Sequence, residues 1–319
     1  MKTVSIVTSA FNEEECLPEL FRRIDNVFQA EPNYDYKIVI ADNSSTDNTW
    51  EIISQEAGKN PKISANLMSR TFSFDAALRS GLDQCNTDLV IIMASDLQDP
   101  PEVIHKLLRS FELGYEQVLV KVISRKSVPF LRRSLSTLFY KLASAMTGGL
   151  IPEYVSDFRL LSKNAYKTIS GIKENHSFVR GLGAWIGFRT TSIEIERPKR
   201  FAGDSKFMKF SLMSAVLTFF RSLIAFSATP LTLISVAGFV MSLFSIIALV
   251  IYSIIWIFIG VPFAGFGTII GVVVLCFSIT MLCFGIISQY LALIYEEVKN
   301  RPVYIISKSI NPIDINTIT

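Results

Sequence analysis

The segment IIMASDLQDPPE, residues 91–102, carries acids and an amide directly after an apolar run. If the chain stays extended past Ala94, alternate side chains project to the same face. Asp96 and Gln98 then offer a carboxylate and an amide oxygen side by side, and both are hard ligands that suit Mg²⁺ or Mn²⁺. Asp99 is placed to cap a helix that starts at the following prolines. The spacing predicts a divalent-cation site before a helix; an ordinary turn acid at a strand end is the alternative for Asp96.

Two other polar clusters also follow apolar runs: FNEEE, residues 11–15, and DNSSTDNT, residues 42–49. Strand-like runs at 3–9, 36–42, 63–69 and 88–94 alternate with helical patterns at 14–29, 46–57, 74–84 and 101–112. Strands that are apolar nearly throughout, alternating with helices, predict a parallel α/β sheet that is covered on both faces. Such sheets bind ligands at the carboxyl ends of their strands. We therefore expect the three polar clusters to converge.

The composition separates the chain into two parts. Residues 222–295 contain no Asp, Glu, Lys or Arg, whereas residues 1–221 have the charge content of an ordinary globular domain. Two apolar segments, 231–259 and 268–293, are each long enough to cross a bilayer core, which needs about 20 residues per helix. They predict a pair of transmembrane helices joined by a short turn. A buried helical hairpin in a soluble protein is the alternative.

Basic residues flank both apolar segments. They are Arg197, Lys199, Arg200, Lys206, Lys209 and Arg221 before the first, and Lys299, Arg301 and Lys308 after the second. The positive-inside rule therefore predicts that both flanks and both termini are cytoplasmic. The first residues make a poor signal peptide, which agrees with a cytoplasmic N-terminal domain. The four cysteines form no CxxC or Cys/His cluster, so neither a disulfide framework nor a zinc site is expected.

These patterns predict four regions. Residues 1–206 form a cytoplasmic α/β domain, 207–229 a juxtamembrane interfacial helix region, 230–295 a two-helix transmembrane hairpin and 296–319 a cytoplasmic C-terminal tail. A core helix of the soluble domain is the alternative for the segment from 207 to 226. The net charge of +3 is too small to indicate nucleic-acid binding.

Seven motifs occur in one order along nearly the whole chain: FNEEE, DNSSTDNT, SDLQDPPE, SDFRLLS, FVRGLGAWIGF, RFAGDSKF and YEEVKNRPVYI. Together they resemble the inverting family-two glycosyltransferases of GT-A fold. The likeness is strongest to the polyprenyl-phosphate branch, which includes dolichyl-phosphate mannose synthases and bacterial bactoprenol glucosyltransferases. The resemblance implies transfer of a sugar, by default glucose, from a UDP-sugar to undecaprenyl phosphate at the cytoplasmic face of a bacterial inner membrane. The lipid-linked product would serve envelope glycan modification, such as that of lipopolysaccharide or O-antigen.

The resemblance also implies roles for individual residues. The donor would be bound by Glu13, Asp42, Asn43, Arg70 and Asp96, and a Mg²⁺ or Mn²⁺ ion by Asp96 and Gln98. The catalytic set would be Asp157, Asp96 and Arg159, and the acceptor phosphate would meet Arg180, Arg200, Ser205 and Lys206. For Asp157 the alternative is a salt bridge with Arg159, and for the basic cluster it is membrane topology alone.

A phosphate acceptor changes what the site has to do. A sugar hydroxyl needs a general base, whereas a phosphomonoester with a second pKa near 6 is already largely dianionic at neutral pH. The difficult step is to bring one anion up to another. We therefore expect catalysis by positioning and by charge neutralisation, with a metal ion at the leaving diphosphate and Arg or Lys side chains at the acceptor.

Several positions depart from the family pattern. Ala94 stands where the family commonly has the first Asp of Asp-x-Asp, and Asn43 and Ser44 replace the second and third residues of Asp-Asp-Gly-Ser. Ser9 replaces a proline, and RTFSFDAAL keeps Arg70 but loses a glycine. These changes concern the affinity for donor and metal more than the fold.

Ala94 motivates a second hypothesis from another class, a catalytically weak protein that binds donor or lipid carrier for a partner in envelope glycan assembly. A processive polysaccharide synthase would carry a Gln-x-x-Arg-Trp string, and no such string occurs. The paired apolar segments are compatible with a homo-oligomer in the lipid bilayer.

Overall fold

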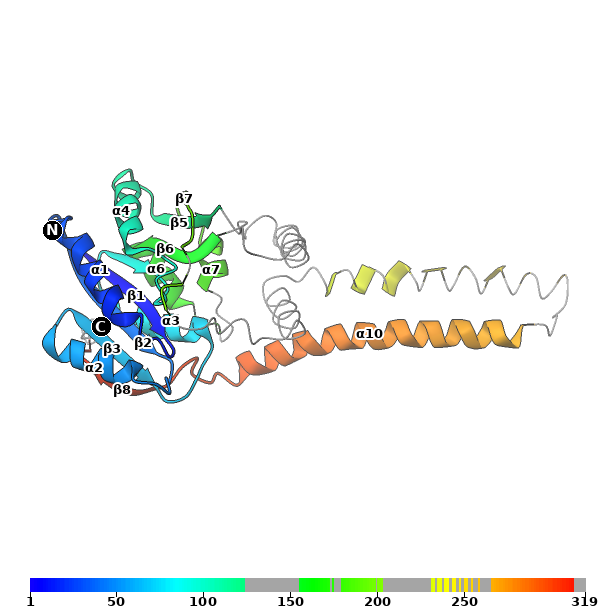
Figure 1. Cartoon of the computed structure of the whole chain (residues 1–319). Helices are drawn as coiled ribbons and strands as arrows, with labels where there is room; N and C mark the ends of the chain where they lie inside the picture. Colours follow the sequence, from blue (N-terminus) through cyan, green and yellow to red (C-terminus); the bar gives the residue numbers. More distant parts are fainter. Residues whose placement is uncertain are drawn as a thin grey trace. The chain divides into compact units, whose positions relative to one another are not determined.

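The computed structural model describes residues 1–123, 155–172, 174, 179–198, 200–202, single positions between 231 and 258, and 265–312. The chain forms two compact units (Figure 1). The first comprises Met1–Ser211 together with Arg301–Thr319, and the second comprises Leu212–Asn300. Ser205, Lys206 and the expected interfacial helix at 207–229 lie outside the described residues.

The first unit is built on an eight-stranded sheet with the order β7-β5-β6-β4-β1-β2-β3-β8. Its strands are β1 (Lys2–Ala10), β2 (Tyr34–Asp42), β3 (Ile63–Met68), β4 (Leu89–Ile92), β5 (Gln117–Val122), β6 (Val155–Ser162), β7 (Thr190–Ile195) and β8 (Ile306–Ile310). The helices of this unit are α1 (Leu17–Gln29), α2 (Thr49–Lys59), α3 (Phe74–Leu82), α4 (Ile104–Glu112), α6 (Lys163–Gly171) and α7 (Val179–Trp185), and a 3₁₀ turn, η1 (Pro101–Val103), precedes α4.

The predicted parallel core is confirmed. Strand β1 pairs in parallel with β2 and β4, and β2 pairs in parallel with β3. The helices α1 and α2 start three residues later than their patterns suggested, because the polar clusters before them form loops of their own. In the first of these loops the Cys16 N–H donates to the Glu13 carbonyl.

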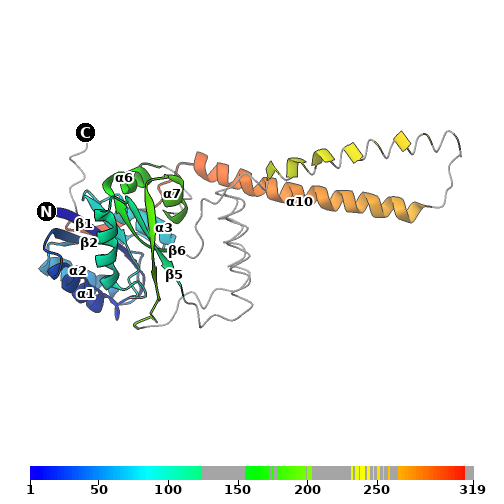
Figure 2. The ribbon, with the colours of Figure 1, turned by 90° about the horizontal axis from the view of Figure 1, so that it is seen from above.

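Helices cover both faces of the sheet, as the strand composition predicts (Figure 2). Neighbouring strand residues point to opposite sides: Ile6 packs with α1, α2 and α4, whereas Val7 packs with α3, α6 and α7. Burying one such aliphatic side chain contributes roughly 1.5–3 kcal/mol. Helix α3 lies so close to the sheet that a Cβ at Gly81 would come within 2.7 Å of the Val7 Cγ1 atom.

The remaining strands were not expected. Strand β6 runs antiparallel to both β4 and β5, so its first residues lie at the carboxyl end of β4; Arg159 is opposite Ile92. Strand β8 runs antiparallel to β3 at the sheet's edge. The sheet is therefore mostly parallel, with antiparallel pairs where β6 and β8 join it.

Part of the 296–319 tail belongs to the sheet of the first unit. Besides the pairing of β8, the Tyr304 hydroxyl donates to Asp83 at 2.9 Å, and its ring packs against Met68. The Asn311 amide donates to the carbonyls of Ala57 at 2.7 Å and Ile63 at 3.0 Å. These bonds attach the end of the chain to β3 and its neighbours.

The second unit contains one long described helix, α10 (Phe266–Val298). Its stretch Val272–Val298 is long and apolar enough to cross a membrane, and it is the one such helix among the residues searched. The described positions between 231 and 258 are also helical, and several carry exposed large apolar side chains. Two transmembrane helices therefore stay a prediction.

Removing the Tyr304 hydroxyl tests how firmly the C-terminal strand is attached. We expect Tyr304→Phe to cost about 1 kcal/mol, because the hydrogen bond to Asp83 is lost. In a unit of this size that corresponds to a Tm roughly 2–4 °C lower in detergent. The control is Ser307→Ala, an exposed position on β8. Equal Tm values for the two variants would contradict the attachment.

Candidate functional site

The three polar clusters meet at the carboxyl edge of the sheet, as predicted. The Asn12 N–H donates to the Ser45 hydroxyl at 2.9 Å, and the Thr46 N–H donates to the Asn12 side chain at 2.8 Å. The Ser95 hydroxyl donates to the Ser9 carbonyl at 2.9 Å. The loop after β1 is thus bonded to the loop after β2, and the end of β1 itself is bonded to the loop after β4.

Each of these three loops contains a residue other than glycine in the left-handed region. The φ angles are 53° at Asn12, 62° at Ser44 and 59° at Leu97. Such angles are uncommon for residues with a side chain, and strain of this kind is concentrated at functional sites. Ser44 stands where the resembled family commonly has glycine, and its positive φ gives the physical reason for that glycine.

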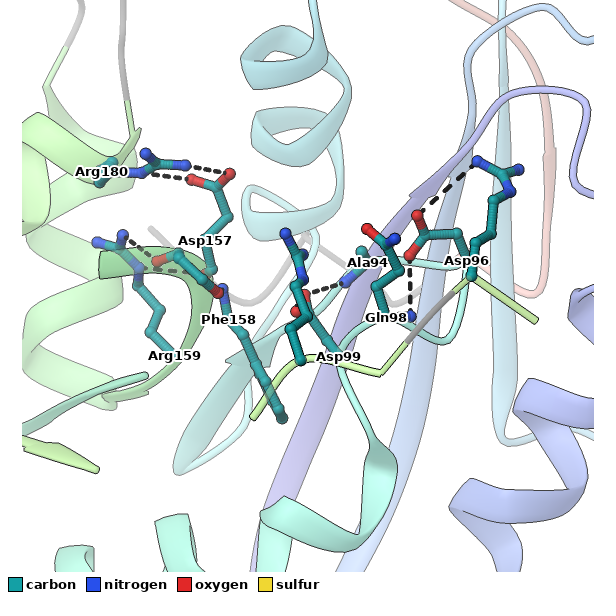
Figure 3. Close-up of polar contacts among 11 residues, drawn as sticks. Ala94, Asp96, Gln98, Asp99, Asp157, Phe158, Arg159 and Arg180 are labelled. Atoms are coloured by element: carbon teal, nitrogen blue, oxygen red, sulfur yellow. Dashed lines mark hydrogen bonds and ion pairs between the residues drawn. The ribbon is translucent and has the colours of Figure 1, made fainter. Parts of the chain in front are cut away.

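Asp96 and Gln98 share one side of the loop after β4, but the route of the chain differs from the prediction. The chain does not stay extended: Leu97 turns it, and the Gln98 N–H donates to the Asp96 carboxylate at 3.1 Å. Ala94, Asp96 and Gln98 are nonetheless half-buried, and the residues between them are buried. Figure 3 shows the side chains of Asp96 and Gln98 close together beside Ala94.

Asp99 does not cap the following helix, which corrects the expectation. One of its carboxylate oxygens accepts from the Ala94 N–H at 3.0 Å, and the other pairs with Arg197 at 2.9 Å. The η1 turn begins after Pro100 without a side-chain cap. Burial raises the pKa of Asp99 although Arg197 opposes the shift. This acid closes the loop and balances a charge.

The donor atoms on this face fit a cation that is shared with another ligand. The described residues contain no group of three or more His, Cys, Asp or Glu side chains that could hold a metal ion. The side chain of Ala94 contributes no oxygen, which leaves the Asp96 carboxylate and the Gln98 amide as side-chain ligands. Mg²⁺ is commonly held by one or two carboxylates, with water and substrate phosphates completing the shell. The chemistry of this pair suits that arrangement.

Arg200 joins two of the predicted donor-side acids. Its guanidinium lies 2.6 Å from a carboxylate oxygen of Glu13 and 3.8 Å from one of Asp96, and it also donates to the Ala202 carbonyl at 2.7 Å. The side chains of Glu13, Asp96 and Arg200 are largely buried. Arg200, which the resemblance assigns to the acceptor phosphate, is therefore bound to residues assigned to the donor and the metal.

Asp157 forms a two-point ion pair with Arg180. The Nε–Oδ1 distance is 3.0 Å and the Nη2–Oδ2 distance is 2.6 Å. The sequence suggested Arg159 as the alternative partner, but the Arg159 guanidinium instead donates to the carbonyls of Ser156 and Asp157, each at 3.3 Å (Figure 3). Burial favours the neutral carboxyl, yet Arg180 and Arg159 outweigh it and lower the pKa of Asp157. Asp157 therefore stays a carboxylate at neutral pH.

Arg159 lies inside the protein. It is 1 % exposed, and burial lowers its pKa to about 10. A Cβ at Gly183 of α7 would come within 2.6 Å of the Arg159 Nη1 atom, so α7 covers the guanidinium closely. The described hydrogen bonds of Arg159 go to backbone carbonyls, which is the arrangement of a residue that supports β6 and α7.

The residues predicted to bind the donor, Asp42, Asn43 and Arg70, differ in their hydrogen-bond partners and in their exposure. Asp42 is fully buried; one carboxylate oxygen accepts from the Ser45 N–H and hydroxyl, and the other has no hydrogen-bond partner in the described part of the chain. Both ends of the Asn43 amide are bonded to the Phe72 backbone, at 2.9 and 2.8 Å. The Arg70 guanidinium stacks on the Phe72 ring at 4.0 Å. Asn43 therefore shapes the loop that carries Arg70.

Two residues of this region were not among the predicted site residues. Asp75, in the first turn of α3, accepts a hydrogen bond from the Val179 N–H at 3.0 Å. Arg197 was counted only among the basic flank, whereas it neutralises Asp99. An acid in the first turn of a predicted helix was a signal for Asp75. Nothing local to the sequence indicated the partner of either residue.

Comparison with known proteins identifies the family of the chain. The model of glycosyl transferase family 2 matches residues 5–170. The uncharacterized glycosyltransferase YkcC of Bacillus subtilis (strain 168) is 31% identical over 305 residues, covering 96% of this chain and 93% of that protein. The SfII prophage-derived bactoprenol glucosyl transferase of Shigella flexneri is 32% identical over 306 residues, covering 96% and 98%.

Among solved structures, glucosyl-3-phosphoglycerate synthase of Mycobacterium tuberculosis, crystallised with Mn²⁺, UDP and phosphoglyceric acid, is 20% identical. It covers 70% of this chain and 78% of its own, with a TM-score of 0.49. The family match spans more than half of the chain, and the bacterial relatives match it almost from end to end. The chain therefore belongs to glycosyl transferase family 2 and is a glycosyltransferase.

Proposed function

We propose that the protein transfers a hexose from a UDP-sugar to a polyprenyl phosphate, undecaprenyl phosphate in bacteria, with inversion at the sugar. The observation that carries the proposal is the placing of two charged groups at one edge of the sheet. Asp96 with Gln98 follows β4, and the Asp157–Arg180 pair lies at the start of β6, beside the same end of β4. The near full-length similarity to bactoprenol glucosyl transferases supports a lipid phosphate as acceptor and glucose as the default sugar.

On the donor side, Asp96 and Gln98 would hold a Mg²⁺ or Mn²⁺ ion, which would neutralise charge on the departing diphosphate. Among the described residues one buried oxygen of Asp42 has no hydrogen-bond partner, and once uncovered it would accept from an N–H of the nucleoside. A buried acceptor without a donor costs about 1–3 kcal/mol, so a ligand that supplies the donor gains affinity. Arg70, on its exposed loop, can reach a phosphate or sugar oxygen of the same donor.

On the acceptor side, Arg180 supplies the positive charge. Asp157 binds the Nε–Nη2 edge of this guanidinium at two points and so fixes its direction. Because Asp157 is ion-paired and its pKa is lowered, it is suited to hold Arg180 in place more than to accept a proton. A phosphate dianion needs no base, so the phosphate oxygen can attack the sugar carbon directly and displace UDP from the opposite side. Arg200, Ser205 and Lys206 complete the proposed acceptor set.

For the membrane we propose two crossings, with both termini on the cytoplasmic side of the inner membrane. The uncharged composition of 222–295 and the apolar helix α10 support this arrangement. So do the helical described positions between 231 and 258, with exposed side chains such as Phe239 and Phe244. The substrate would then be drawn from the adjoining leaflet. Assembly of the spans into a homo-oligomer stays a prediction.

The second candidate is a catalytically weak protein that binds the donor or the lipid carrier for a partner. Ala94 favours it, because one carboxylate of the usual metal motif is missing. The deciding experiment incubates the purified full chain with undecaprenyl phosphate, Mn²⁺ and a panel of UDP-sugars, and analyses the lipids by mass spectrometry. We expect one donor to give a lipid heavier by one hexose. Binding of donor without product from any of them would favour the second candidate.

Asp96→Asn should lower turnover roughly 100-fold and raise the Mn²⁺ concentration needed for half-maximal rate, because the metal-facing carboxylate is lost. The rate is measured as a function of Mn²⁺. Glu15→Gln removes the same charge from an exposed side chain of the loop after β1 and serves as the control. An unchanged metal dependence in Asp96→Asn would remove Asp96 from the site.

Arg180→Lys keeps the positive charge but cannot form the two-point pair with Asp157. We expect the KM for undecaprenyl phosphate to rise about tenfold, the value of a bond worth about 1.4 kcal/mol, while the affinity for UDP stays unchanged. The control is Arg189→Lys, because the Arg189 guanidinium stacks on the Tyr115 ring and is not part of the proposed site. A parallel loss of UDP affinity would contradict the division between donor and acceptor sides.

A further inference from the structure

Asp75 has no part in the donor or acceptor sets described above, yet its carboxylate joins two elements of the site. Its Oδ1 atom accepts from the Val179 N–H at 3.0 Å, and Val179 is the first residue of α7. The cap of its own helix is supplied by another residue: the Ser73 hydroxyl accepts from the Ala76 N–H at 3.2 Å. The Asp75 side chain is therefore directed across to α7 and does not serve α3.

The residue after Val179 is Arg180, which holds Asp157 in the two-point pair. The Asp75 bond fixes the backbone from which the Arg180 side chain leaves. Helix α7 has only seven residues, so its own hydrogen bonds give it little rigidity. On the side of α7 that faces β6, Gly183 contacts the buried Arg159 side chain. Besides the apolar packing of Val179 and Leu182, this short helix is held by the contact of Gly183 with Arg159 and, at its start, by the Asp75 bond.

The same carboxylate belongs to a balanced group of charges. The described charged groups that act on Asp75 are Asp157 and Arg159 of β6 and Arg180 of α7. Burial raises the pKa of Asp75 to about 6; Asp157 adds to the rise, while the Val179 bond and the two arginines oppose it. With Asp75 ionised, two acids face two arginines. Protonation leaves a neutral carboxyl and a weaker bond to α7.

We propose that Asp75 is a positioning residue of the transfer site: by holding the first N–H of α7, it sets where Arg180 meets Asp157 and hence how well the site receives the acceptor phosphate. The inference deepens the proposed function and rests on it. Asp75 need not touch either substrate, because it acts through α7.

The test uses three variants of the full chain in detergent. Asp75→Ala removes the acceptor of the Val179 bond, Asp75→Asn keeps an oxygen acceptor without charge, and Ser73→Ala removes the cap of α3 alone. We expect Asp75→Ala to raise the KM for undecaprenyl phosphate about tenfold, with Asp75→Asn in between and Ser73→Ala unchanged. The affinity for UDP with Mn²⁺, measured by calorimetry, should change by less than about twofold in all three, because α7 lies on the acceptor side.

A pH series separates positioning from mere stability. Because folding raises the pKa of Asp75, its ionised form is the less stable one, and the wild type loses relative stability as pH rises from about 4 through 6. At pH 7.5 Asp75→Asn should therefore unfold at the same temperature as the wild type or at a higher one. Its KM for undecaprenyl phosphate should nevertheless be higher than that of the wild type. The proposal would be overturned by an Asp75 variant that is less stable and that loses affinity for UDP and for the acceptor to the same extent. An unchanged KM for undecaprenyl phosphate in Asp75→Ala would also overturn it.

A binding measurement distinguishes failure of this inference from failure of the proposed function. The affinity for undecaprenyl phosphate is measured without donor, for the wild type and for Asp75→Ala. Weaker acceptor binding in Asp75→Ala supports the inference even where a given UDP-sugar is not transferred. Equal acceptor binding in the two proteins refutes it even where transfer by the wild type is rapid.

Discussion

Compensation of negative charge is the constraint on which this structure depends. The loops after β1 and β4 and the start of β6 bring carboxylates to one edge of the sheet, where their mutual repulsion and burial are unfavourable. Arginines from a later stretch of the chain neutralise them: Arg200 pairs with Glu13, Arg197 with Asp99 and Arg180 with Asp157. The carboxylates at this edge of the sheet are therefore neutralised only after Arg180, Arg197 and Arg200 have packed against it. In the proposed function, Arg180 is also the group that meets the acceptor phosphate.

The periodic half of the fold could be predicted from the sequence. The apolar runs that became β1 to β4 carry their signal locally, because a strand buried on both faces must be apolar throughout. Strand β5, QVLVKV, carries a similar apolar signal, which the prediction did not include, whereas β6 and β8 are less regular. Strand β6 contains the charged SDFR motif, and Arg159 is accommodated inside only because α7 covers it. Strand β8 is polar and follows a long apolar segment, so its pairing with β3 depends on a contact far away in the sequence.

The candidate site shows the same division. Residue type and spacing predicted a common face for Asp96 and Gln98; both are half-buried in the loop after β4, where Leu97 turns the chain. Partners were another matter. The sequence suggested a helix cap for Asp99 and a salt bridge to Arg159 for Asp157. In the structure Asp99 pairs with Arg197, and Asp157 pairs with Arg180 of another element. Local chemistry predicts what a side chain can offer, whereas the tertiary fold decides which group receives it.

The attachment of β8 has a consequence for biosynthesis. Its five residues emerge from the ribosome after α10, so the catalytic sheet stays one strand short until the whole apolar stretch has been translated. During that interval β3 presents an open edge, which is a site where strands of other chains can add. Translation of the apolar stretch and closure of the sheet are thus linked by chain order. A polypeptide that stalls before residue 306 has its acids and arginines but no finished sheet.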